Sequence, residues 1–218
     1  MKKIVCILLI SSVIFCGCGK ETATSTNNGV LEKTTEPSTK NVDVSVISSS
    51  NVVHSVSEGL MANDCTSYEA MEKQSDLIVF GTKTSEFLEP PSIDGGVYKL
   101  MAEFQIENVI KGGEEYNSGD KITILEDVEY SVDTNIVYHS HGYQRMENGK
   151  QYYLMLGNGD SVRQYYIIGG VNGKVPVDTK EANTINSEEL GTEEKEQTDK
   201  WVKRNRTKLI KEDKSVTK

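Results

Sequence analysis

Apolar and polar side chains alternate most clearly between residues 97 and 110. Four apolar residues fall on one side of an extended chain there: Leu100, Ala102, Phe104 and Ile106. The residues between them are mostly Glu and Gln. A period of two with one polar side is typical of a strand that packs against a core through one face only. The Lys-Gly-Gly sequence at 111–113 then predicts the end of this strand.

Shorter segments with the same character predict further strands at 77–82, 120–126, 151–156, 163–168 and 175–177. Asn148-Gly149 and Asn172-Gly173 are sequences that favour the tight turns of β-hairpins. Pro176 favours an edge position for the last strand, because proline cannot donate a ladder hydrogen bond. The stretch 127–149 is polar and irregular, so no strand is predicted in it.

Two helices are predicted outside the strands. Thr66 and Glu69 form a capping-box pattern at the start of a short helix over 66–74. Near the C-terminus, residues 188–214 carry a thin apolar stripe at helical spacing around Trp201. Charge along that segment changes from acidic to basic, which suits the helix dipole. This second helix either docks on the strands, binds a partner, or is a frayed tail.

These elements predict a mainly β domain of the α+β class, with a short helix before the first core strand and a C-terminal helix. Four segments are similar to a pattern in small exported proteins of Gram-positive bacteria: 74–81, 104–112, 118–122 and 149–156. The order of elements over about 74–175 also resembles the netrin-like domain of tissue inhibitors of metalloproteinases. The resemblance implies an OB-like antiparallel barrel of five to six strands. It does not carry inhibition over, because those inhibitors use a free N-terminal cysteine braced by disulfides.

The N-terminus has the features of an export signal. Lys2 and Lys3 precede an almost entirely apolar stretch at 4–15, which is too short to span a bilayer. The sequence Phe15-Cys16-Gly17-Cys18 resembles the lipobox of bacterial lipoproteins. That resemblance implies cleavage after Gly17 and a diacylglyceryl group on Cys18, a covalent lipid rather than a cofactor. Two acyl chains hold a protein stably on a membrane. The expected location is therefore the extracytoplasmic face of a bacterial cell membrane; the alternative is a plain secretory signal.

The composition changes three times along the chain, which predicts four parts: a signal peptide at 1–17, a lipidated Cys and tether at 18–58, the β domain at 59–182, and a charged helix or tail at 183–218. Residues 20–57 contain fourteen Ser or Thr and no aromatic residue. Such a segment cannot bury enough apolar surface to offset the entropy of ordering. Alternating valines leave open an edge strand at 42–47 within the stretch 42–56.

The net charge excludes one class of partner. It is −9 for the whole chain and would become −11 once Lys2 and Lys3 are removed with the signal. Non-specific nucleic-acid binding needs a basic surface, so no nucleic-acid partner is expected. An acidic protein is also repelled by anionic lipid, so the acyl chains must supply the attachment.

Two residue groups are candidates for metal or thiol chemistry. His139 and His141 are two residues apart and would share one face of an extended chain, where two imidazoles bind Zn²⁺ or Cu²⁺. The competing interpretation is a pair of exposed histidines in a polar loop. Cys65 is the one cysteine outside the first 18 residues, and no base partner is evident near it. We therefore expect it to be a small buried side chain.

Paired tyrosines are the candidates for ligand binding. Tyr152, Tyr153, Tyr165 and Tyr166 lie on two predicted strands, where one of each pair would be exposed. Exposed tyrosines anchor protein partners, and OB-like domains bind ligands on such strands. The motifs of serine hydrolases, zincins and phosphate-binding loops are absent from the sequence. The sequence thus favours a non-enzymatic, membrane-anchored binding module for a protein or cell-envelope partner. The alternatives are a metal- or solute-binding lipoprotein that uses His139 and His141, and an envelope enzyme without a recognisable motif.

Overall fold

The computed structural model describes residues 42–57, 65, 67–93, 95–178 and 189–213, which all belong to one compact unit. The predicted signal peptide, Cys18 and the part of the predicted tether up to residue 41 lie outside the described residues. The elements in chain order are η1 (Val44–Ser48), β1 (Val53–Ser57), α1 (Tyr68–Gln74), β2 (Leu77–Glu89), β3 (Tyr98–Lys111), β4 (Lys121–Ser131), β5 (Ile136–Ser140), β6 (Gln151–Asn158), β7 (Gln164–Ile167), η2 (Gly170–Gly173), β8 (Lys174–Pro176) and α2 (Thr192–Glu212). No helix in this described part is long and apolar enough to cross a membrane.

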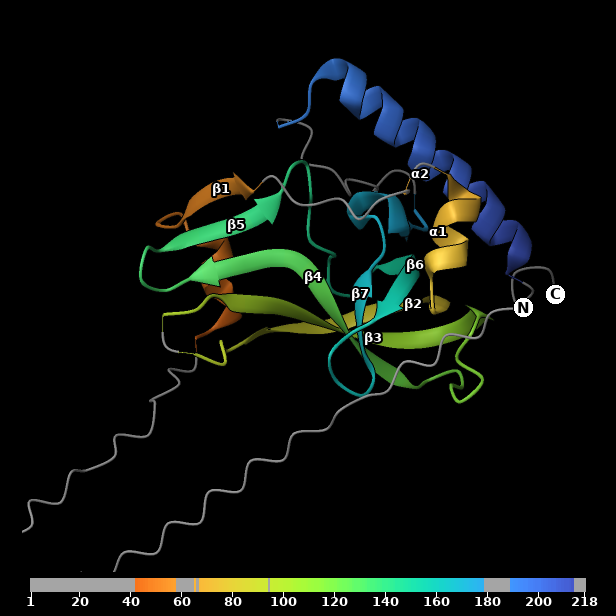
Figure 1. Cartoon of the computed structure of the whole chain (residues 1–218), viewed down its shortest axis with the longest axis horizontal. Helices are drawn as coiled ribbons and strands as arrows, with labels where there is room; N and C mark the ends of the chain where they lie inside the picture. Colours follow the sequence, from red (N-terminus) through yellow and green to blue (C-terminus); the bar gives the residue numbers. More distant parts are fainter. Residues whose placement is uncertain (1–41, 58–64, 66, 94, 179–188, 214–218) are drawn as a thin grey trace, which may run out of the picture. The chain divides into compact units, whose positions relative to one another are not determined.

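The prediction of a mainly β protein with a C-terminal helix is confirmed. Eight strands form one sheet in the order β1-β5-β4-β3-β2-β6-β7, and β8 pairs with β6 (Figure 1). β4 also pairs with β7 in parallel, through Thr123–Leu125 and Gln164–Tyr166. Each of β2, β3, β4, β6 and β7 is therefore hydrogen-bonded to two others of this set, and the pairings form a closed cycle.

The long hairpin of β2 and β3 follows the alternation in the sequence. Leu100, Ala102, Phe104 and Ile106 are fully buried, whereas the glutamates and glutamine between them are partly exposed. β2 passes very close to β3 at Gly81, where an added Cβ would lie 2.1 Å from the carbonyl oxygen of Gln105. Only glycine fits there, and the register between the two strands shifts at this point.

Three apolar clusters make up the core. The largest lies among the five strands of the cycle and includes Leu77, Phe104, Ile122 and Leu154. A second fills the space beneath the two α-helices, and a third lies between β3, β4, β5 and η1. The five paired strands thus enclose one core, and the remaining elements cover its flanks.

Both predicted helices are present, with one change at the first. Ser67 caps α1 with its hydroxyl, which accepts a hydrogen bond from the backbone N of Ala70 at 3.1 Å. The predicted cap, Thr66, lies outside the described residues. Ser67 takes the extended backbone of a cap and is followed at once by helical residues, so the helix begins later than predicted.

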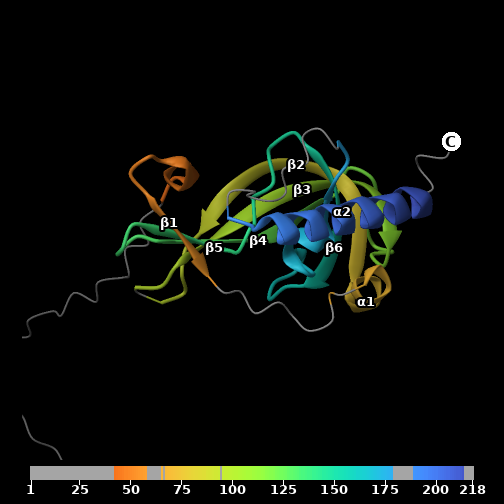
Figure 2. The same cartoon turned by 90° about the horizontal axis from the view of Figure 1, so that it is seen from above.

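The C-terminal helix α2 docks on the domain, the first of the three outcomes left open by the sequence. It lies over the part of the sheet that contains β6 (Figure 2). Val202 and Leu209 are buried in the second cluster. Asp213 is fully buried beyond the helix end, where its carboxylate accepts hydrogen bonds from Tyr153 Oη at 3.1 Å and Asn108 Nδ2 at 2.6 Å.

The expectation of an irregular region at 127–149 was wrong in part. β4 continues to Ser131, and β5 pairs with it after a turn in which Asn135 has a positive φ of 54°. The stretch is polar because only alternate side chains, among them Val128 and Val137, are buried. Averaged over its whole length the stretch is polar, and this average conceals the alternation of buried and exposed residues in β5.

The folded part also begins before residue 59, the expected start of the β domain. Residues 44–48 form the 3₁₀ helix η1 instead of an edge strand, and Ile47 is buried against the third cluster. The edge strand comes later, at β1, which pairs in parallel with β5. Asp43 starts η1 because its carboxylate accepts the backbone N–H of Ser45. This local cap favours helical turns over strand for the valines that follow.

Candidate functional site

A groove opens between two connections that are far apart in the sequence. It has a volume of about 680 Å³ and is bordered by the β2–β3 connection at 90–97 and the β6–β7 connection at 159–163. Leu125 of β4 and the first residues of β7 also line it. The parallel pairing of β4 with β7 brings these elements together, because it fixes the β6–β7 connection beside β3 and β4.

Exposed apolar side chains gather around this groove. Ile93 is 74% exposed and Tyr166 is 44% exposed, and both line it. Val162, 95% exposed, is in the same β6–β7 connection. Pro90 and Pro91 stiffen the opposite wall, because a proline ring fixes φ. Apolar surface that is open to solvent and framed by rigid backbone is typical of an interaction site.

Tyr166 is held in place by a glycine on the neighbouring strand. Its ring lies across Gly157 of β6, where an added Cβ would lie 2.5 Å from Tyr166 Cζ. Tyr165 points the other way, into the core, and its hydroxyl lies 2.9 Å from that of Tyr116. Burial raises the pKa of Tyr165 above its usual range. Both tyrosines line the groove: Tyr166 with an exposed ring, and Tyr165 from the buried side.

Polar groups of both signs border the groove. Glu89 and Asp160 are acidic, and Lys99 is the basic residue among the lining side chains. Hydroxyls of Ser92 and Ser161 add donors and acceptors to the lining. A mixture of apolar and polar groups is usual at protein-binding surfaces.

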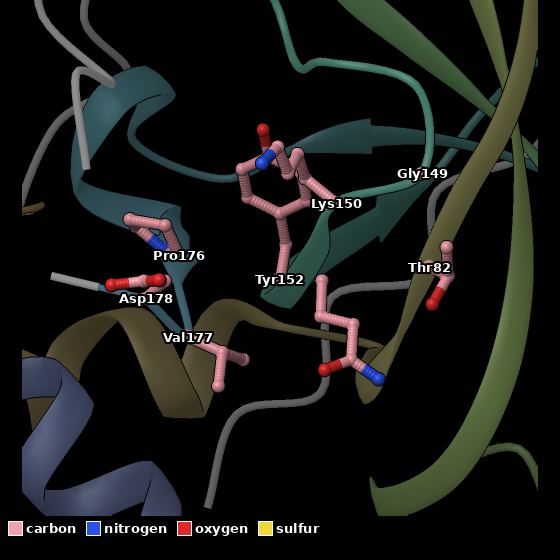
Figure 3. Close-up of a pocket in the computed structure, with 8 residues that line it drawn as sticks. Thr82, Gly149, Lys150, Tyr152, Pro176, Val177 and Asp178 are labelled. Atoms are coloured by element: carbon pink, nitrogen blue, oxygen red, sulfur yellow. The ribbon is translucent and has the colours of Figure 1, made fainter. Parts of the chain in front are cut away.

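The other candidate tyrosines are inside the molecule. Tyr152 is 6% exposed, and its hydroxyl accepts a hydrogen bond from the backbone N of Glu147 at 3.0 Å. Tyr153 is 1% exposed and donates to Asp213. Tyr152 also borders a smaller cavity of about 340 Å³, with Thr82 on one side and Pro176, Val177 and Asp178 on the other (Figure 3).

All three histidines of the chain gather near the start of α2. His139 Nε2 lies 3.4 Å from Glu189 Oε1, and His141 Nε2 lies 3.5 Å from Glu194 Oε2. The His54 ring on β1 is 5.9 Å from the His139 ring. His139 is 7% exposed, so it is not a residue of an exposed loop as one interpretation had it. The two glutamates lie about fifty residues further along the chain, and for that reason the sequence did not suggest them.

The described residues contain no group of three or more His, Cys, Asp or Glu placed to hold a metal ion. The histidines and glutamates form separate pairs instead of one coordination sphere. Cys65 is buried in the second cluster beside Met71, and its Sγ lies where a Cβ on Gly169 would come within 3.0 Å. This agrees with its expected place as a small buried side chain.

A buried charged network, which sequence reasoning missed, crosses the interior near β2 and β4. Lys83 Nζ donates to Glu126 Oε1 at 2.9 Å and to Glu86 Oε2 at 2.5 Å. Glu126 also accepts from Tyr143 Oη at 2.9 Å and from the backbone N of Met146 at 2.8 Å. Every polar atom of the Glu126 carboxylate thus has a partner, as buried charge requires.

A second buried lysine lies beside this network. Lys174 Nζ donates to the carbonyl oxygen of Gln144 and lies 3.6 Å from the centre of the Tyr143 ring. Burial, together with the nearby Lys83 charge, lowers the pKa of Lys174 to about 7. Burial and the Glu126 charge raise the pKa of Tyr143 well above its usual range. Lys174 is fully buried, so its amine faces the protein interior.

No protein-family model matches the chain, and no curated protein matches it. The geometry of its own residues therefore carries the functional interpretation.

Proposed function

We propose that this chain is a lipid-anchored extracytoplasmic binding module without catalytic activity, which holds a protein or cell-envelope partner in the groove. The observation that carries the proposal is the groove itself, with Ile93 and Tyr166 among the exposed residues that line it. The buried groups Lys174 and Tyr143, whose pKa values are perturbed, do not line this opening. An open surface that combines apolar and charged side chains is suited to recognition.

The strand pairings support an OB-like barrel as the scaffold. If β2, β3, β4, β6 and β7 are counted as first to fifth, neighbours follow the order first, second, third, fifth, fourth and first again. The third and fifth strands are parallel, and the other neighbours are antiparallel. OB-type domains bind ligands with the first–second and fourth–fifth connections. These are the two connections that border the groove here.

The anchor is proposed from the sequence around Cys18, which resembles a lipobox. A diacylglyceryl group on Cys18 would hold the domain at the outer face of the membrane, and the Ser/Thr-rich segment after it would separate the two. A partner from the cell envelope would then meet the groove within a short distance of the bilayer.

Site-specific photo-crosslinking in intact cells tests the groove. A photoreactive amino acid replaces Tyr166 or Ile93 in the full chain, and Val56, which is 42% exposed on β1, serves as the matched control. We expect one crosslinked species from both groove positions and none of that mass from position 56. The Cys18→Ala chain should be released from the membrane and should lose this species if the partner belongs to the envelope. Equal crosslinking from all three positions would exclude the groove as the binding site.

A further inference from the structure

The outward face of α2 carries a row of exposed cations. At 100° per residue, Lys200, Lys203, Arg204 and Lys211 fall within an arc of about 100°. Val202, Asn205 and Leu209 lie on the opposite side, which is buried. The four cations are exposed and span about 16 Å of the helix. We call these four residues the basic face.

The basic face has few internal partners. Lys200 lies 3.7 Å from Glu196, one turn earlier in the helix. Among the residues that the structure describes, Lys203, Arg204 and Lys211 form no ion pair within 4 Å. Lys208 lies to the side of this face and contacts Glu69 of α1. Lys208 and, more weakly, Arg204 lower the pKa of the Glu69 carboxyl. The positive charge of Lys203 and Lys211 is therefore the most available to an external anion.

The helix dipole does not account for this arrangement. It favours cations only in the last turn of a helix, which here contains Lys211. Lys200 and Lys203 lie two or more turns before the helix end, on the same face. The net charge of −9 also makes a concentration of cations on one surface unusual for this chain. A surface function explains both the spacing and the side on which the cations lie.

We propose that the basic face rests on the anionic surface of the membrane and orients the domain. The proposal builds on the lipid anchor proposed for Cys18, which would keep α2 close to lipid headgroups. Lys and Arg near an anionic bilayer each strengthen binding about five-fold. The first two turns of α2 carry Glu193 and Glu196 on the same side, so only the half from Lys200 onward would contact the lipid.

Such contact would turn the groove away from the bilayer. α2 lies along one side of the molecule, and the β2–β3 and β6–β7 connections lie on the other (Figure 1). A domain tethered by acyl chains alone could rotate freely and bring its groove against the membrane. With the basic face on the lipid, the groove opens toward the cell envelope, where a partner can enter it.

Trp201, the only tryptophan of the chain, provides a native probe beside the basic face. The lipidated full-length protein is reconstituted in vesicles of phosphatidylcholine, with or without phosphatidylglycerol, that carry a headgroup spin label. We expect the spin label to quench Trp201 fluorescence in the anionic vesicles and much less in the neutral ones. Salt at about 1 M, where the Debye length is about 3 Å, should remove the difference.

The variant Lys203→Glu with Lys211→Glu should abolish this quenching. Lys73→Glu with Lys121→Glu changes the net charge by the same amount at exposed positions on α1 and β4 and should leave it intact. Equal quenching in both kinds of vesicle, or in the two double variants, would overturn the proposal. Mass spectrometry of the membrane-bound protein reports acylation separately. If Cys18 carries no lipid, the protein released from Cys18→Ala cells should still sediment with anionic vesicles, at least about 25-fold more strongly than its basic-face variant.

Discussion

The buried network around Glu126 and the open groove differ in how far their charged side chains are exposed to solvent. The network of Lys83, Glu126 and Tyr143 has almost no exposed surface, and its charged groups are satisfied by each other and by backbone. The groove, in contrast, presents apolar side chains to solvent together with the charged residues Glu89, Lys99 and Asp160. The perturbed ionisable groups Lys174 and Tyr143 are thus buried with this network, whereas the groove offers its side chains to solvent.

Breaking the buried network should have the largest effect. Glu126→Gln removes the charge that faces Lys83 and leaves the ammonium with only the partly exposed Glu86 as a carboxylate partner. We expect the free energy of unfolding to fall by about 3–5 kcal/mol, as for other buried pairs that lose one member. Urea unfolding followed by circular dichroism measures it. Asp127→Asn, an exposed neighbour on the same strand, should cost less than about 0.5 kcal/mol; similar losses in both variants would contradict a closed network.

Lys174 should make stability depend on pH. Its pKa is about 7 in the folded protein and about 10.4 in the unfolded chain, so between these values the unfolded chain binds more protons. The free energy of unfolding should therefore rise with pH from about 7 to about 9.5, by about 1 kcal/mol per unit, and level off below pH 7. Lys174→Met should flatten this rise. Parallel pH profiles for the two proteins would mean that the lysine stays charged inside the fold.

A change at the groove should alter its shape and leave the fold intact. In Gly157→Ala, the new methyl group would meet the Tyr166 ring and push it from its place. The ring is 44% exposed and can turn outward, so we expect less than about 1 kcal/mol of destabilisation. The ring signals of Tyr166 in the NMR spectrum, assigned with Tyr166→Phe, should shift, and those of the buried Tyr153 should not. An unchanged Tyr166 signal would show that the ring does not pack on Gly157.

The strands of the large core were predictable because each buries one face. The alternation through Phe104 and the apolar run at 151–156 identified β3 and β6 from local pattern alone. β5 escaped prediction because its buried positions include His139, which counts as polar in a sequence. β1 escaped for a related reason: it is an exposed edge strand, and Val53 is 61% exposed.

The groove could not be predicted from local pattern. Its walls, at 90–97 and 159–163, are more than sixty residues apart and meet only through the pairing of β4 with β7. The sequence did indicate that one tyrosine of each pair would face outward, but it did not show which one. On β7, Tyr166 is exposed and Tyr165 is buried, as expected for adjacent residues of a strand with one open face. On β6, both faces are covered, so both Tyr152 and Tyr153 are buried. Covering by β8 and α2 is a tertiary effect that no strand signals by itself.

The burial of Asp213 has a consequence for how the protein is made. Its carboxylate joins Tyr153 of β6 and Asn108 of β3, residues that are synthesised long before it. The cluster beneath the helices is therefore incomplete until the chain has been produced as far as residue 213. β2 also waits for β6, which follows it by about seventy residues, and distant pairings of this kind slow folding. The domain should accordingly remain unfolded during its synthesis and fold in one late step, which would leave the chain threadable through a narrow channel if it is exported as proposed.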